Sequence, residues 1–393
     1  MTMISRRLFL TSAALIGCSA AAHPLLTPMA FASAPGDNRL VVIILRGAMD
    51  GIDAFQPYGD KNLRKVRQTL SLGPDHGARD LDGFFALHPG LQGLWPLWKA
   101  GQLGFAPAVS TPYRDKRSHF DGQTMLEAGT GTDLDLDRQQ DGWLNRLLQA
   151  MPGQSSETAY SIGAEDMRIL QGPAAASSWA PEANLVISPQ ATRLLTHVYH
   201  DDPLFREAGE RAMAIAAGLE AEGKLVPDRK EHLALAQFAA DRLNRDTRIA
   251  TFSLAGWDTH AGQAGNLTRM LERLSETILA LRDGLGPNWD STTVMAMTEF
   301  GRTVRENGSA GTDHGTGGAM LVVGGAVRGG RAMGDWPGLA EGDLYDGRDL
   351  MPLRDIRAYA AWAMHAKFGI AKSVLEQQIF PALDMGSDPR LLA

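Results

Sequence analysis

Cysteine is almost absent from this chain of 393 residues, which contains only Cys18. A single cysteine cannot form a disulfide within the chain, and it cannot supply a cluster of thiolate ligands to a metal. Disulfide-stabilised folds and cysteine zinc sites are therefore excluded. We also expect Cys18 to be removed with an N-terminal leader, so a cysteine nucleophile is excluded in the mature chain.

Blocks of basic residues are missing as well. The chain has 38 Lys and Arg against 45 Asp and Glu, which gives a formal net charge of −7. Because binding to a phosphate backbone depends on clustered Lys and Arg, we expect no nucleic-acid partner. Apolar runs long enough to cross a bilayer are absent too, so we expect no transmembrane span in the mature chain.

The first 32 residues have the features of a twin-arginine export signal. Arg6 and Arg7 precede the apolar run Thr11–Gly17, and Ala30–Ala32 forms a small-x-small cleavage site. We expect cleavage after Ala32 and export of the folded protein to the periplasm or beyond the cell. Two alternatives are a membrane anchor behind a chance arginine pair and a lipoprotein signal at Leu15–Cys18, which would make its cysteine the lipidated N-terminus.

Apolar runs rich in β-branched residues alternate with amphipathic segments along the rest of the chain. The predicted strands are Leu40–Leu45, Gln102–Val109, Ile249–Ala255, Val294–Met297 and Ala319–Gly325. The predicted helices are Leu87–Gly101, Ser118–Ala128, Asp141–Ala150, Gln263–Leu285 and Asp355–Phe368. This alternation indicates an α/β fold with a mainly parallel sheet.

Residues 33–393 are predicted to form one domain. Two Ala-rich segments, Pro203–Gly223 and Arg229–Arg245, predict a helical pair, so we expect a helical insertion near 203–245 that acts as a lid or side subdomain. Pro173–Ser178 is interpreted as a low-complexity connection.

Polar residues follow four of the predicted strands. They are Asp50 after the first strand, Ser118 and His119 after the second, Asp258 and His260 after the third, and Glu299 after the fourth, with Asp313 and His314 in the loop that comes next. Ligands of open α/β sheets bind beyond the carboxyl ends of the strands, so we expect these residues to converge. Carboxylates mixed with imidazoles are typical ligands of zinc, manganese or iron. The glycines at 308, 311, 315, 317 and 318 are expected to let the backbone approach something small.

Each of these residues also has a structural explanation. Asp50 before a glycine is typical of a turn, and Ser118 is typical of a helix N-cap. For Glu299 the structural explanation is an ion pair with Arg302, and for the segment Asp258–His260 it is an ordinary polar loop. The exception is the histidine at position 314, because its flanking glycines make it a poor core residue. The histidines at 88, 197, 200, 232 and 365 are interpreted as surface residues.

Six segments carry a resemblance to a known family. They are Leu45–Gly51, Arg117–Gln123, Asp141–Arg146, Trp257–Gln263, Thr298–Arg331 and Gly334–Leu339. Together with the leader they resemble the exported family called domain of unknown function 1501, which is grouped with the alkaline phosphatase and sulfatase superfamily. The resemblance implies an alkaline-phosphatase-like three-layer sandwich. It also implies a metal-assisted hydrolase with two metal sites, zinc or manganese as the divalent ion, and a nucleophile at a helix N-terminus.

The same resemblance implies roles for individual residues. Asp50 resembles the first metal-site carboxylate, Asp258 and His260 resemble an Asp-then-His pair, and His314 resembles a late histidine. Glu299 stands where the superfamily has Asp followed by His.

Phe300 therefore replaces one histidine, and a metal site loses a ligand unless His119 or Asp313 takes its place. The nucleophile is assigned to Ser118, and His119 is expected to act with it in catalysis. An alternative is Ser110–Arg114, which is faintly similar to the sulfatase Cys-x-Pro-x-Arg element.

We accordingly expect a hydrolase of phosphate or sulfate esters. One metal would be held by Asp258, His260 and His314, and a second metal near Asp50 and Glu299 would help to activate Ser118. The arginines expected to clamp the anion are Arg46, Arg117 and Arg302. Two alternatives are a superfamily member that has lost its chemistry and binds an anionic glycan or a second exported protein, and a redox enzyme.

Overall fold

The computed structural model describes residues 37–114, 116–132, 141–163, 167–180 and 230–393. The expected leader, with its cleavage site and Cys18, lies outside the described residues. The first helix of the expected insertion, at 203–223, also lies outside them.

An eight-stranded sheet forms the centre of the molecule, with the order β11-β5-β10-β9-β1-β8-β6-β7. Its strands are β1 (Arg39–Arg46), β5 (Leu103–Ser110), β6 (Ala159–Ile162), β7 (Ser177–Trp179), β8 (Ile249–Ala255), β9 (Thr292–Met297), β10 (Gly318–Val323) and β11 (Arg354–Asp355). All pairs are parallel except those of β10 with β5 and β9. A small second sheet contains β2 (Phe55–Gln56), β4 (Ala86–Leu87) and β3 (Arg79–Asp80). The predicted α/β fold with a mainly parallel sheet is confirmed.

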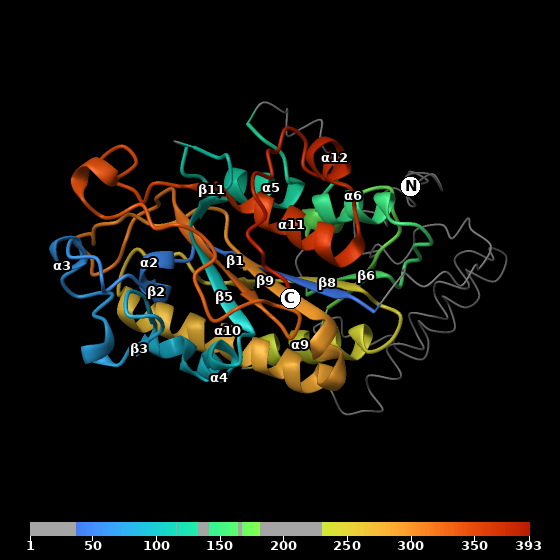
Figure 1. Ribbon diagram of the computed structural model, residues 1–393, viewed down its shortest axis with the longest axis horizontal. Coiled ribbons are helices and arrows are strands. Elements are labelled where there is room, and N and C mark those ends of the chain that lie inside the picture. The colour runs from blue at the N-terminus through green and yellow to red at the C-terminus, as the bar shows by residue number, and fades with distance from the viewer. Residues whose placement is uncertain (1–36, 115, 133–140, 164–166, 181–229) are drawn as a thin grey trace, which may run out of the picture.

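Helices cover both faces of this sheet (Figure 1). The α-helices are α2 (Gly51–Ala54), α3 (Leu63–Val66), α4 (Trp95–Lys99), α5 (His119–Ala128), α6 (Trp143–Ala150), α9 (Glu231–Leu243), α10 (Gln263–Leu285), α11 (Ile356–Phe368) and α12 (Lys372–Val374). Short 3-10 turns lie at Pro74–His76, Pro89–Leu94, Arg168–Leu170, Gly286–Ser291 and Glu341–Asp343, and a π-turn lies at Leu375–Ile379. In Figure 1, α4, α9 and α10 lie along one side of the sheet and α5, α6 and α11 along the other.

The alternation of side chains along β1 explains the layers. Val41, Ile43 and Leu45 point into a core that they share with α9 and α10. The intervening Leu40 and Val42 belong to a second core with α6 and α11. Because successive residues of a strand face opposite sides, a continuous apolar run is required to fill both cores.

Two segments differ from their predictions, and the helix predicted over Arg229–Arg245 is confirmed. The expected helix over Leu87–Gly101 is divided into a 3-10 turn and α4, with a proline at the start of each. The segment Pro173–Ser178, interpreted as a connection, leads into β7, which pairs in parallel with β6. The predicted helix Arg229–Arg245 is present as α9, and it packs on α10 and the sheet as part of a layer.

The sheet topology brings the ends of several strands together. Strands β9, β1 and β8 are parallel neighbours, and β5 has the same direction because β10 is antiparallel to both β5 and β9. Their carboxyl ends therefore lie at one edge, where β10 begins. No helix among the described residues is long and apolar enough to cross a membrane.

Lys367 near the end of α11 provides a test of the packing by pH. Burial lowers the pKa of Lys367 from 10.5 to about 8. Below pH 8 both the folded and the unfolded chain carry this proton, and burying the charge costs up to about 3 kcal/mol. The penalty disappears as the pH rises from about 8 towards the unfolded value. Between pH 7.5 and pH 10, we expect the free energy of unfolding of wild type to rise relative to that of Lys367→Met. Urea denaturation at each pH measures this difference.

The exposed lysine of α12 provides the control for this experiment. Lys372→Met should follow wild type across the same pH range, because its ammonium group is not buried. Parallel pH profiles of wild type and Lys367→Met would contradict the assignment.

Candidate metal centre

Three histidines meet at the carboxyl edge of the sheet. His260 lies in the loop after β8, His314 lies in the loop before β10, and His119 is the first residue of α5. The loop carrying His314 is fixed to the end of β9, because residues 302 and 314 form an antiparallel bridge. Distant parts of the sequence are thus brought to one place by strand order alone.

The carboxylate of Asp258 lies at the centre of these rings. Its Oδ1 is 3.0 Å from Nε2 of His260 and 3.2 Å from Nε2 of His314. Its Oδ2 is 3.4 Å from Nε2 of His119. The Nε2 atoms of His260 and His314 are themselves 2.9 Å apart. Donor atoms around a tetrahedral zinc ion lie roughly 3.3 Å from one another, so these separations match those of a ligand set.

The other ring nitrogen of each histidine points to a hydrogen-bond acceptor. Nδ1 of His119 lies 2.7 Å from Oε1 of Glu299, and Nδ1 of His260 lies 3.1 Å from Oδ1 of Asp313. Nδ1 of His314 lies 2.8 Å from the carbonyl oxygen of Arg117. Because a carbonyl or carboxylate oxygen only accepts, each Nδ1 donates its hydrogen outwards. In the neutral rings, all three Nε2 lone pairs therefore face the Asp258 carboxylate.

Charges around the cluster shift several pKa values. The hydrogen bond to Glu299 raises the pKa of His119, whereas burial lowers the pKa of His314. Burial alone would raise the pKa of Asp258, but the hydrogen bond from Arg302 and the neighbouring positive charges outweigh it and lower that pKa. A hydrogen bond from Asn307 lowers the pKa of Asp313. Both carboxyl groups are therefore ionised at neutral pH.

Each Nε2 can face the ionised carboxylate in two ways, either as the N–H of a protonated ring or as a lone pair on a cation that both groups share. Nε2 of His119 is buried and has no hydrogen-bond partner among the described residues. The donor atoms of His119, Asp258 and His314 all lie within 4.8 Å of one another, as ligands of one ion must. Mixed imidazole and carboxylate donors suit zinc, manganese or iron, and outward Nδ1 hydrogen bonds are typical of metal-bound histidines. These residues fit a divalent metal ion.

Arg302 is buried beside this cluster. Its Nη1 donates to Oδ1 of Asp258 at 2.8 Å, and its Nε donates to the Thr312 hydroxyl at 3.3 Å. Its Nη2 is buried and has no partner among the described residues. A buried guanidinium nitrogen without an acceptor is destabilising, so the unsatisfied Nη2 of Arg302 requires an explanation.

Two predicted ligands have other roles in the structure. The buried carboxylate of Asp50 caps α2 and forms an ion pair with Arg67, whose Nη1 lies 2.6 Å from Oδ2. The buried carboxylate of Glu299 accepts hydrogen bonds from His119, from Gln123 and from the amide of Gly47. These bonds outweigh the effect of burial and lower the pKa of Glu299. This corrects the expectation that Asp50 and Glu299 face an ion, because their oxygens are already occupied.

The predicted N-cap of α5 is confirmed. The hydroxyl oxygen of Ser118 accepts from the amide of Asp121 at 3.4 Å, and the Ser118 amide donates to the Tyr113 hydroxyl at 2.7 Å. The neighbouring residue His119 stacks on Phe300, with ring centroids 5.1 Å apart. Phe300 thus supports the ring of His119.

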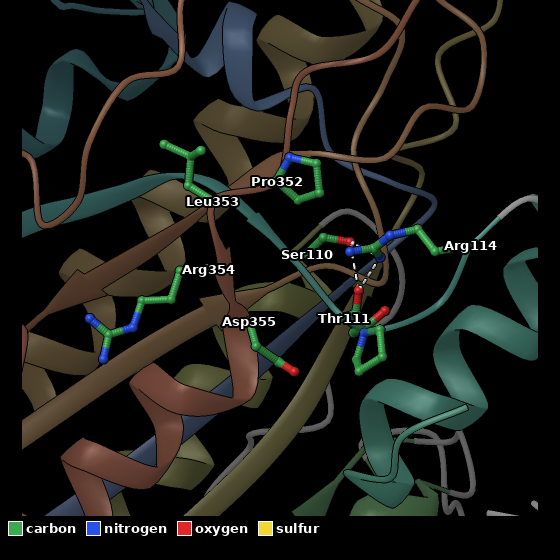
Figure 2. Close-up of a pocket in the computed structure, with 8 residues that line it drawn as sticks. Ser110, Thr111, Arg114, Pro352, Leu353, Arg354 and Asp355 are labelled. Atoms are coloured by element: carbon green, nitrogen blue, oxygen red, sulfur yellow. Dashed lines mark hydrogen bonds between the residues drawn. The ribbon is translucent and has the colours of Figure 1, made fainter. Parts of the chain in front are cut away.

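The alternative nucleophile lies elsewhere. Ser110 and Thr111 line a separate pocket of about 230 Å³ with Arg114 and residues 352–355. Figure 2 shows the Arg114 side chain turned back onto Ser110 and Thr111. The Ser110 hydroxyl accepts from Arg114 and lies 2.9 Å from the Thr111 carbonyl oxygen. None of the clustered histidines lines this pocket.

The remaining predicted residues are distributed as follows. Arg46 is paired with Glu127 at 2.8 Å and donates to Gln123. Arg117 is partly exposed, and its guanidinium lies 3.9 Å from Asp349. The histidines at 88 and 232, which were interpreted as surface residues, are buried. Residues 197 and 200 lie outside the described residues.

The chain belongs to the family described as protein of unknown function (DUF1501), which matches residues 76–364. A comparison with curated proteins finds no match. The family assignment made from the sequence motifs is therefore confirmed.

Several solved structures are similar to this one at low sequence identity. The lipoteichoic acid synthase LtaP from Listeria monocytogenes is 8% identical, with a TM-score of 0.40, and the match covers 95% of this chain and 80% of that one. The C-terminal periplasmic domain of EcEptC from Escherichia coli, a zinc complex, is 10% identical with a TM-score of 0.37 and coverages of 76% and 77%. A protein of the alkaline phosphatase superfamily from Vibrio parahaemolyticus is 12% identical with a TM-score of 0.35 and coverages of 78% and 67%.

The loops of the centre pack too closely for a side chain at Gly301. A Cβ atom added there would lie 1.8 Å from the carbonyl oxygen of Gly317. We expect Gly301→Ala to separate the two loops, to lower the free energy of unfolding by at least about 3 kcal/mol and to weaken metal binding. Gly308→Ala is the matched control, because no atom lies within 4 Å of its added Cβ. Denaturant unfolding of both variants tests this, and equal stabilities would contradict the packing described.

Proposed function

We propose that this protein is an exported, metal-dependent hydrolase of phosphate or sulfate esters. The observation that carries the proposal is the convergence of three imidazole Nε2 atoms on one ionised carboxylate, with each Nδ1 held outwards by an acceptor. This arrangement favours a bound divalent cation over any purely structural role. The expected leader supports export, and the acidic overall charge is compatible with a small anionic substrate rather than a polyanion.

The ion would be held by His119, Asp258 and His314, with His260 as a fourth donor. A divalent ion, zinc or manganese, would polarise an ester oxygen at this place. The protein's own contribution is to fix the donors. Glu299 and Asp313 orient the rings of His119 and His260, and outward hydrogen bonds of this kind make the inner nitrogens stronger donors.

Arg302 would bind the anionic group of the substrate. Its Nη1 is held by Asp258 while Nη2 has no acceptor among the described residues, so the guanidinium is positioned before the substrate binds. Arg117, which is partly exposed nearby, is a second source of positive charge. We assign a structural role to Arg46, because its guanidinium forms an ion pair with Glu127.

Ser118 would supply the attacking hydroxyl. The amide of Asp121 donates to its oxygen, and the oxygen lies at the N-terminus of α5, where developing negative charge is stabilised. Since Oγ accepts from that amide, the hydroxyl hydrogen remains available for transfer. His119, first expected to act in catalysis with Ser118, is assigned instead to the metal.

Removal of one histidine tests the proposal. We expect wild type, purified with its native metal, to contain a divalent ion by inductively coupled plasma mass spectrometry and to hydrolyse p-nitrophenyl phosphate or p-nitrophenyl sulfate. His314→Ala should lower the metal content by at least about tenfold and abolish turnover, because an inner donor is lost. His76→Ala removes an exposed histidine on a distant turn and should behave as wild type.

Two results would contradict the hydrolase. A wild-type protein that contains no metal and hydrolyses neither ester would exclude the proposed hydrolase. A metal-loaded protein that turns over neither ester would favour the alternative, a member of the superfamily that binds an anionic glycan or a second exported protein. In that case Ser118→Ala should leave binding unchanged.

Arg302→Lys tests the anion site separately. Lysine keeps one positive charge near Asp258 but removes the planar nitrogen that has no partner. We expect the inhibition constant for inorganic phosphate, and the KM for the ester, to rise about 10- to 100-fold while the metal content stays unchanged. Arg305→Lys, at an exposed arginine in the same segment, is the control. Unchanged phosphate inhibition in Arg302→Lys would exclude Arg302 from the anion site.

A further inference from the structure

We infer that each chain binds a single metal ion, and that the guanidinium of Arg67 fulfils the role that a second ion would have beside Asp50. This inference rests on the metal site proposed above and goes beyond it. The two-site expectation placed the second ion near Asp50 and Glu299. The contacts of these two carboxylates decide against it.

The first carboxylate is saturated by protein donors. Oδ2 of Asp50 accepts from Nη1 of Arg67 at 2.6 Å and from Nε2 of Gln263 at 2.7 Å. Oδ1 accepts from Nη2 of Arg67 at 3.1 Å and from the amides of Ile52 and Asp53. Five hydrogen bonds leave no oxygen lone pair directed at an open space, so Asp50 has no coordination to offer.

Arg67 is itself fixed in this position. Its Nε donates to the carbonyl oxygen of Val304 at 3.0 Å, and its Nη2 also donates to the carbonyl oxygen of Thr303 at 3.0 Å. The side chains of Arg67 and Asp50 are 0% and 1% exposed. An arginine so buried and so fully bonded cannot swing away to admit an ion, because each broken bond would leave a buried charge without a partner.

The second carboxylate is equally occupied. Oε1 of Glu299 accepts from His119, from Gln123 and from the amide of Gly47, and Oε2 lies 3.0 Å from the Thr298 hydroxyl. The next residue is a phenylalanine, which packs between the rings of His119 and Tyr113. A second ion would require two ligands from the segment after β9. This segment instead supplies the carboxylate of Glu299, which orients His119, and the apolar ring of Phe300.

The remaining potential metal ligands lie close enough together to bind one ion. His119, Asp258 and His314 form the only described group of three or more potential ligands within reach of a common ion. His260 joins the same group through Asp258 and His314. Activity should therefore rise linearly with added metal and stop at one equivalent.

Metal stoichiometry tests the inference directly. The full-length protein, as exported, is passed over a size-exclusion column in buffer with a weak chelator, and its bound Zn²⁺ and Mn²⁺ are measured by plasma mass spectrometry and native mass spectrometry. We expect one ion per chain. Two ions would overturn the inference but leave the hydrolase standing, whereas no ion would overturn both.

Two matched variants locate the ion. Asp258→Asn should lose it, because the central carboxylate is an inner ligand. Asp50→Asn should retain one ion per folded chain, because Asp50 bonds only to protein groups. The loss of its partner leaves the buried charge of Arg67 unpaired and destabilises the folded chain, so only the monodisperse fraction of Asp50→Asn is assayed.

The double variant Asp50→Asn/Arg67→Met removes both charges of the pair and avoids this problem. We expect it to retain one ion in the monodisperse fraction of the column. Loss of the ion from this folded double variant would show that Asp50 takes part in metal binding, and it would overturn the inference.

Discussion

The negative charge of Asp258 holds the centre of this molecule together. Its two oxygens face three imidazole nitrogens and one guanidinium. Neutral imidazoles oriented in this way repel a carboxylate, so the arrangement is stable only with positive charge among them. Glu299, Asp313 and the carbonyl oxygen of residue 117 determine which nitrogen of each ring faces inwards. The nitrogens that would bind a metal are thus determined by the hydrogen-bond acceptors on the other side of each ring.

The convergence of residues that follow different strands was the part of this site that could be predicted from sequence. A parallel sheet places the carboxyl ends of its strands at one edge, and polar residues after three of the predicted strands therefore had to lie near one another. Asp258 and His260 after β8 and His314 before β10 meet as expected. The apolar periodicity also defined α10, whose bounds, Gln263–Leu285, agree with the prediction. Both successes rest on patterns that are local in sequence and repeat with the period of the element.

The parts that could not be predicted depend on single long-range contacts. Nothing in the spacing of Asp50 and Arg67 indicates an ion pair, since Arg67 follows a short helix and reaches back through the folded loop. The glycines at 311, 315 and 317 were expected to admit a ligand, but they allow backbone to approach backbone instead, as an added Cβ would lie 2.4 Å from atoms of neighbouring loops. Such long-range contacts can be recognised only in the folded structure.

The reversed direction of β10 has a consequence for how the molecule matures. Because this strand is antiparallel to both of its neighbours, it starts at the edge where they end, and the loop before it places His314 there. The proposed metal site is therefore incomplete until this strand, which enters the sheet between β5 and β9, has been inserted. If the site binds an ion as proposed, tight binding requires a chain that has finished folding, and the ion would then report that folding is complete.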